Sequence, residues 1–160
     1  MKKRIIVLFV MVYVLALVGC TPKQEQTEPE SLVGYIVIED NTLYLDIVEV
    51  ITLEDIERIT ELGLNHQDDF PNGYHIYNPD TGKDTYDLTD ETVYTFVDLN
   101  LLFVNDEDGD RSYTTTKKEE FIQHLNTSYS DVPPAQTVPF FIEVKDDKVI
   151  SITEKFEFTI

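Results

Sequence analysis

The sequence has little of three things on which common functions depend: cysteine, basic residues and glycine-rich loops. Its 160 residues include one Cys, which excludes an intramolecular disulfide framework and a Cys-based zinc cluster. Twelve Lys and Arg stand against 31 Asp and Glu, which gives a formal net charge of −19 at pH 7. Because nucleic-acid binders neutralise phosphates with basic side chains, this charge excludes that class of function. The six glycines are scattered, so no phosphate-binding loop is predicted.

Residue patterns that indicate catalysis are also scarce. No serine lies in a Gly-x-Ser-x-Gly motif. His66, His75 and His124 have no second histidine at i+2 or i+4, and we expect them at surface or rim positions. With 31 acids, a carboxylate pair ~5–9 Å apart, as in glycoside hydrolases, is expected from number alone and has no predictive value. We therefore expect a non-catalytic protein, with a small carboxylate-dependent hydrolase as an alternative.

The first twenty residues have the pattern of an export signal. Three basic residues at 2–4 precede a run without charge at 5–18, which would span about 21 Å as a helix, short of the ~30 Å hydrocarbon core. This combination is typical of a secretory signal peptide. The run ends in Leu17-Val18-Gly19-Cys20, which resembles the lipobox of bacterial lipoproteins. The resemblance implies that Cys20 receives a diacylglyceryl group and that the signal peptide, residues 1–19, is removed.

The implied mature chain is an acidic body on a tether. Removing three of the 12 basic residues and no acids changes the formal charge from −19 to −22, and anionic headgroups repel such a body. Residues 21–31 contain no aliphatic or aromatic side chain, so we expect a disordered tether over 20–31. Residues 32–160 are expected to form one globular domain. The predicted location is the outer face of the cell membrane, reached through the lipid on Cys20.

Alternation of apolar and polar residues dominates the domain. It predicts short strands separated by turn residues, as in Leu43, Leu45 and Ile47. Helical spacing follows Thr52, with Gly63 as the C-terminal cap, and a second helix follows Thr116. We expect an α+β fold, mainly antiparallel β, with about seven strands in a curved sheet or small barrel and two short helices. The expected strands cover residues 33–38, 43–48, 74–77, 86–88, 93–99, 139–145 and 149–158.

The densest acidic cluster occupies residues 105–110. Closely spaced carboxylates around a glycine suit Ca²⁺. The EF-hand template fails, however, because aligning it on Gly109 places Thr115 where a bidentate Glu is required. One interpretation is a looser Ca²⁺ site with Asp106, Asp108 and Asp110 as ligands, and the other is a solvated Asp-Gly turn. A weak Ca²⁺-binding envelope module is therefore the first alternative function, with the hydrolase as the second, and no other cofactor is predicted.

A partner surface is predicted on the strand at 74–77. Alternation places His75 and Tyr77 on one face, where a polar histidine and an amphipathic tyrosine suit binding of a ligand or envelope protein. Segments 71–78 and 139–156 resemble parts of small uncharacterised secreted proteins and lipoproteins of Gram-positive bacteria. The resemblance implies a Gram-positive envelope and brings no activity with it. The expected function is interaction with an envelope protein or ligand.

Overall fold

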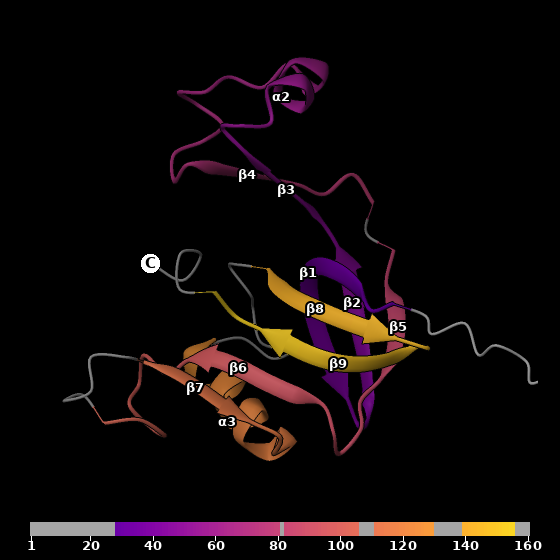
Figure 1. The fold of residues 1–160 in the computed structure, drawn as a ribbon. Helices are drawn as coiled ribbons and strands as arrows, with labels where there is room; N and C mark the ends of the chain where they lie inside the picture. The colour runs from indigo at the N-terminus through magenta and orange to yellow at the C-terminus, as the bar shows by residue number, and fades with distance from the viewer. Residues whose placement is uncertain (1–27, 81, 106–110, 130–138, 156–160) are drawn as a thin grey trace, which may run out of the picture.

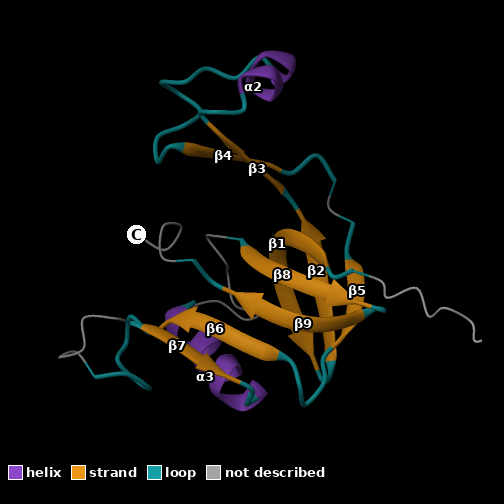
Figure 2. Ribbon diagram, viewed as in Figure 1, coloured by secondary structure: helices purple, strands orange, loops and turns teal. Residues whose placement is uncertain are grey.

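The computed structural model describes residues 28–80, 82–105, 111–129 and 139–155, which form nine strands and two helices. Figure 2 shows that strands dominate and that the helices lie at opposite ends of the molecule. The predicted mainly β fold of the α+β class is confirmed. The elements are β1 (Glu30–Glu39), β2 (Thr42–Ile47), β3 (Glu49–Thr52), α2 (Ile56–Leu62), β4 (Tyr74–Tyr77), β5 (Asp84–Asp87), β6 (Val93–Val97), β7 (Ser112–Thr115), α3 (Lys118–Ser128), β8 (Phe140–Lys145) and β9 (Lys148–Thr153).

Seven strands form one curved sheet in the order β5-β2-β1-β8-β9-β6-β7. Most neighbours are antiparallel, but β9 runs parallel to β6 and, over a single residue pair, to β5. That single pair, Asp87 opposite Lys148, joins the first strand of the order to the fifth. Five strands therefore close on themselves in a ring-like arrangement, and β6 and β7 extend the sheet beside it (Figure 1). The predicted curved sheet of about seven strands is confirmed.

The strand β1 changes partners at Gly34. Residues 34–39 pair with β2 and residues 30–34 pair with β8, so Gly34 belongs to both ladders. A Cβ atom here would overlap the carbonyl oxygen of Asp46 and lie 2.7 Å from Cδ1 of Leu45. Glycine is typical of strand positions where another backbone approaches this closely. Gly34 therefore permits the close contact of β1 and β2 on which the curved sheet depends.

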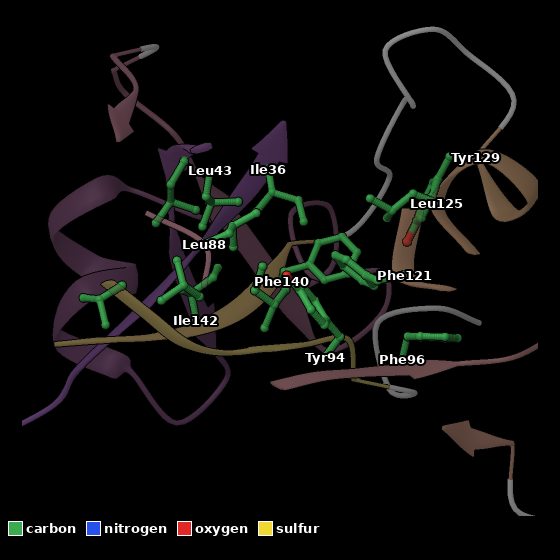
Figure 3. Close-up of a cluster of buried hydrophobic side chains, with 14 residues drawn as sticks. Ile36, Leu43, Leu88, Tyr94, Phe96, Phe121, Leu125, Tyr129, Phe140 and Ile142 are labelled. Carbon is green, nitrogen blue, oxygen red and sulfur yellow. The ribbon is translucent and has the colours of Figure 1, made fainter. Parts of the chain in front are cut away.

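The main hydrophobic core lies where the curved sheet meets α3 (Figure 3). The ring of Phe121, from α3, stacks on Tyr94 of β6 with centroids 4.9 Å apart and meets Phe140 of β8 edge-on. Such aromatic pairs contribute ~0.5–1.5 kcal/mol each beyond the burial of their surface. The helix is thereby fixed against the sheet. The buried members of the cluster are Ile36, Leu43, Leu45, Leu88, Tyr94, Phe96, Phe121, Leu125, Tyr129, Phe140, Ile142, Val144, Val149 and Ile152.

Between β2 and β5 the chain leaves the ring and forms a projection, residues 49–77, which we call the arm (Figure 1). Its strands β3 and β4 pair with each other, and its own small core consists of Ile51, Ile59 and Phe70. The connection from Tyr77 to Asp84 therefore joins strands of two different sheets, because β4 pairs with β3 and β5 with β2. The arm is an insertion between two neighbouring strands of the ring.

Neither helix begins directly after the threonine that precedes its helical spacing in the sequence. The helix α2 begins at Ile56, and the carboxylate of Asp55 accepts hydrogen bonds from N–H (2.7 Å) and Oγ1 (2.8 Å) of Thr52. The helix α3 begins at Lys118, and Lys117, which makes no side-chain capping bond, directly precedes it. The C-terminal cap of α2 at Gly63 is confirmed, with φ of 66°.

Candidate functional site

The segment after β6, residues 98–104, is folded around a buried carboxylate; we call it the leucine loop. Asp98 has no exposed surface. Its carboxylate accepts hydrogen bonds from the backbone N–H groups of Leu102 (3.0 Å), Phe103 (2.6 Å) and Val104 (3.0 Å). Charged acceptors make such bonds roughly twice as strong as neutral ones. The loop is therefore held in one conformation by a charge inside the fold.

The apolar side chains of the leucine loop point in two directions. Phe103 packs inward, edge-on to Phe96 and stacked on Tyr113. The three leucines of the loop, Leu99, Leu101 and Leu102, are partly exposed to solvent. Leu101 has a φ of 54°, a conformation that costs a bulky residue free energy. Exposed apolar surface on a strained, fixed segment is typical of binding sites. The exposed fractions are 38% for Leu99, 38% for Leu101 and 43% for Leu102.

A second buried carboxylate, Glu154, lies just beyond β9 and ties three elements together. Its Oε2 atom lies 2.9 Å from Nε2 of His124, on α3, and accepts a 3.0 Å bond from the N–H of Val97 at the end of β6. Its Oε1 atom accepts a 2.6 Å bond from the hydroxyl of Tyr129. Every polar atom of this carboxylate therefore has a partner within the fold, as burial of a charge requires.

The pKa values of the buried groups reflect these bonds. Burial raises the pKa of Asp98, but the N–H groups of the leucine loop and the nearby His124 outweigh it, so the pKa lies below its usual value. For Glu154, burial is likewise outweighed by His124 and Tyr129, and its pKa is lowered. Burial and the Glu154 charge raise the pKa of Tyr129. Both carboxylates are therefore ionised at neutral pH, the opposite of the raised pKa that a general acid needs.

The leucine loop and α3 are connected through Ser128. Its Oγ lies 3.2 Å from Nδ1 of His124 and accepts a 3.3 Å bond from Nδ2 of Asn100, in the loop. The order serine, histidine, carboxylate is that of a hydrolytic triad. Here, however, His124 is 1% exposed, and both its ring nitrogens have partners inside the fold. A triad histidine also has both nitrogens bonded, but there Nε2 contacts the serine and Nδ1 the carboxylate. In this protein the ring is reversed, with Nδ1 toward Ser128 and Nε2 toward Glu154, and this orientation and the burial of His124 support a structural role, in which the network positions the loop.

The structure brings His75 and Tyr77 to one face of β4, next to the interior of the arm. Nδ1 of His75 lies 3.2 Å from the carbonyl oxygen of Asp69, and the His75 ring is 5.9 Å from Phe70. Tyr77 packs against the small core, with the Arg58 guanidinium 5.2 Å from its ring centroid. Both side chains are half-buried among arm residues. Their role as a partner surface stays a prediction.

The remaining predicted site residues lie outside the described residues. These are Cys20 and the proposed calcium ligands Asp106, Asp108 and Asp110, so lipidation and Ca²⁺ binding stay predictions. Among the residues the structure describes, no three His, Cys, Asp or Glu side chains are grouped closely enough to hold a metal ion. Within the same ranges, no helix has the length and apolar composition to cross a bilayer.

A polar cleft of about 370 Å³ lies at the beginning of α3. Asp90 and Glu119 line it together with Lys117 and Lys118. Both lysines have partners: Lys118 Nζ donates to the carbonyl oxygen of Asp40 (2.8 Å), and Lys117 pairs with Glu120 (2.7 Å). Neither buried carboxylate, Asp98 or Glu154, lines this cleft. The cleft is thus separate from the leucine loop and its network.

Sequence reasoning missed the buried network. The prediction that His124 lies at the surface or rim is wrong, because α3 buries it between Phe121 and Leu125, against Phe96. A signal was present: His124 stands three residues after Phe121 and one before Leu125, on the apolar face of the helix. Glu154 likewise follows Ile152 at the period of a buried strand face. Nothing in the local sequence, however, pairs these residues with each other.

The chain was also compared with known proteins. Comparison with protein-family models, with curated proteins and with solved structures gives no match.

Proposed function

We propose that this protein is a lipid-anchored, non-catalytic binding protein on the outer face of a Gram-positive cell membrane. In this proposal the lipid on Cys20 determines location, and the leucine loop is the surface that contacts an envelope partner. The single observation that carries the proposal is the set of three exposed leucines on a strained loop fixed by buried charge. The two halves, anchoring and contact, are supported separately.

Anchoring is supported by the residues around Cys20 and by the energetics of acyl chains. Each buried CH₂ group contributes ~0.8 kcal/mol, so one acyl chain holds only reversibly, and two chains on one glyceryl group give stable attachment. The first strand begins at Glu30, ten residues beyond Cys20. A polar tether of this length reaches roughly 16–19 Å. The body would therefore stand just clear of the headgroups, with its surface available to proteins.

Contact through the leucine loop is supported by its rigidity. A binding segment loses conformational freedom on association, and one that is already fixed loses less. The three backbone bonds to Asp98 and the link from Asn100 to Ser128 provide that fixation. Leu101 has an unfavourable φ, and its partly exposed side chain gains little from burial in the fold, so stability alone does not explain why a leucine is present here. Binding of a partner by this side chain explains its presence.

Photo-crosslinking in intact cells tests the proposal. A photoreactive amino acid replaces Leu102 in the full-length chain, and the matched control replaces Thr85, which is also exposed but lies on β5 of the ring. We expect a discrete protein adduct in the membrane fraction from position 102 and none from position 85. Equal adducts from both positions, or none from position 102, would contradict the proposal.

A further inference from the structure

We infer that the leucine loop points away from the membrane and that its partner is an apolar patch on the water-exposed, extracytoplasmic domain of another protein. This inference rests on the proposed function and specifies the kind of partner and its place in the envelope. It combines two observations on the described residues. One is where the anchoring segment joins the ring, and the other is where the leucine loop leaves it.

The segment that follows Cys20 joins the ring at one end of its strands. Strand β1 begins at Glu30, which lies opposite Val144, near the end of β8. Val144 in turn lies opposite Val149, near the beginning of β9. The beginning of β9 therefore marks the end of the molecule to which the lipid would be attached.

The leucine loop lies beyond the opposite end of the same strand. Strand β6 runs parallel to β9, with Thr95 opposite Thr153, so both strands end on the same side. The N–H of Glu154 continues this pairing, because it donates a 2.8 Å bond to the carbonyl oxygen of Thr95. The loop follows directly after β6. Figure 1 shows the beginning of β9 and the end of β6 at opposite ends of the molecule.

The length of β9 separates the two ends. Glu154 lies five residues after Val149, which corresponds to ~16–17 Å at the rise of a strand. The bond from the N–H of Val97 to the Glu154 carboxylate places the end of β6 at the same level. With a tether of roughly 16–19 Å, the loop would stand roughly 32–36 Å from the lipid surface when the strands follow the membrane normal.

This placement selects among the candidate occupants. Turning the loop down onto an anionic membrane would bring the acidic body against headgroups of the same charge. A second copy of the chain carries the same formal charge of −19 and is repelled. The lipid-embedded segments of membrane proteins lie near the attachment end, away from the loop. A protein domain in the aqueous part of the envelope suits both the apolar side chains of the loop and their position.

Energy transfer to labelled lipid tests the inference. The sequence contains no Trp, so Leu102→Trp gives a single donor in the loop. Lys148→Trp gives the matched donor at an exposed position beside the attachment end. The lipidated full-length chains are purified from the membrane fraction and reconstituted in vesicles of phosphatidylcholine and phosphatidylglycerol with dansyl-labelled phosphatidylethanolamine. Transfer falls steeply with distance and so reports which end faces the bilayer. Thermal melts confirm that each variant is folded.

We expect transfer from position 148 to exceed that from position 102 at least about fivefold, because the two positions differ roughly twofold in distance from the headgroups. Equal transfer, or a blue shift of the emission from position 102 on reconstitution, would place the loop at the bilayer and overturn the inference. Chains that do not remain with the vesicles would overturn the proposed anchoring and the inference with it.

The photo-crosslinking experiment at position 102 separates the inference from the proposed function. Mass spectrometry of the adduct identifies the peptide of the partner to which the chain is joined. A peptide from an extracytoplasmic domain supports the inference. A peptide from a transmembrane segment would overturn the inference and leave the proposed function standing, whereas no adduct contradicts both.

Discussion

Two buried tyrosines differ in whether the hydroxyl has a partner. Tyr129 donates its hydroxyl proton to Glu154 over 2.6 Å. The hydroxyl of Tyr94 is buried with no hydrogen-bond partner among the described residues, and the neighbouring Thr92 donates to the carbonyl oxygen of Val149 instead. A buried polar group without a partner costs ~1–3 kcal/mol. The same hydroxyl is thus stabilising at one position and destabilising at the other.

Deleting each hydroxyl should therefore have opposite effects. We expect Tyr129→Phe to lower the free energy of unfolding by about 1–3 kcal/mol, because Glu154 loses a charged hydrogen bond in the interior. Tyr94→Phe should be neutral or stabilising by up to about 1 kcal/mol, because no bond is lost. Urea unfolding monitored by circular dichroism measures both. A loss at Tyr94 as large as that at Tyr129 would contradict this description of the core.

Gly34 and Gly73 distinguish steric overlap from backbone strain. Gly34→Ala should destabilise the fold by about 2–3 kcal/mol, since its Cβ would meet Asp46 and Leu45 of the neighbouring strand. Gly73→Ala meets open space, but its φ of 84° is unfavourable for alanine, so a loss of about 1 kcal/mol is expected. Thermal unfolding of the two variants provides the comparison. A smaller effect at Gly34 than at Gly73 would show that β1 and β2 can separate without cost.

Single residues were the hardest features to predict from the sequence. Gly63 is predictable as a helix cap because the signal is local: a glycine directly after helical periodicity. The burial of His124 is not predictable locally, because its partners, Glu154 and Phe96, are about thirty residues away in the sequence. Polar residues are exposed in most proteins unless they are paired, and the pairing itself depends on the fold. The loop around Asp98 was missed for the same reason.

At the scale of elements, we expect Leu101 to lower the stability of the leucine loop while its side chain contributes to binding a partner. Asn adopts positive φ more readily than Leu, so Leu101→Asn should raise the free energy of unfolding by about 0.5–1 kcal/mol. Leu99→Asn, without a positive φ, serves as the control and should bring no such gain. Chemical denaturation measures the difference. If Leu101→Asn destabilises the fold, the side chain of Leu101 supports the loop and is not kept for binding.

The buried carboxylates predict a dependence of stability on pH. The pKa values of Asp98 and Glu154 are lowered by folding, so their contribution is present above their unfolded pKa values, near 4, and is lost as the pH falls through the folded values. Folding raises the pKa of Tyr94 to about 12, so its effect on stability changes at alkaline rather than at acidic pH. Its contribution is complete below pH ~10 and is lost as the pH rises toward 12. Stability should therefore be greatest between these two windows.

Urea unfolding between pH 2 and pH 7 checks the acidic window. The Asp98→Asn variant should be less stable at neutral pH and should lose stability less steeply below pH ~4, because one of the linked groups is gone. The exposed Glu57→Gln variant is a charge-matched control from α2. An Asp98→Asn profile with the same acid slope as the unaltered chain would mean that Asp98 is not linked to folding.

Most of the elements could be predicted from local sequence, but their arrangement could not. Alternation located β1, β2, β4 and the β8–β9 hairpin, because the period of two is visible within six residues. The arm was missed, because its recognition requires knowing that β2 pairs with β5 across more than thirty residues. The short β3 and β7 were also missed. Pairing between distant strands is set by tertiary packing, which single-strand patterns do not contain.

At the scale of the whole molecule, the proposed function depends on where the domain is held. The ring, the arm and the leucine loop form a strongly acidic body whose formal charge disfavours contact with anionic lipid. In the proposed function, attachment through a lipid on Cys20 resolves this conflict, because the anchor would act through apolar burial while the body stays away from the headgroups. In the same proposal, the leucine loop would then meet a protein partner in the envelope.

The most direct test of this account is the mass and N-terminus of the protein purified from the membrane fraction of its own cells, with a Cys20→Ser chain for comparison. We expect a polypeptide that begins at residue 20 and carries a diacylglyceryl group on that cysteine. The Cys20→Ser chain should remain unprocessed or leave the membrane. An unmodified Cys20 in a processed, membrane-retained chain would contradict the account.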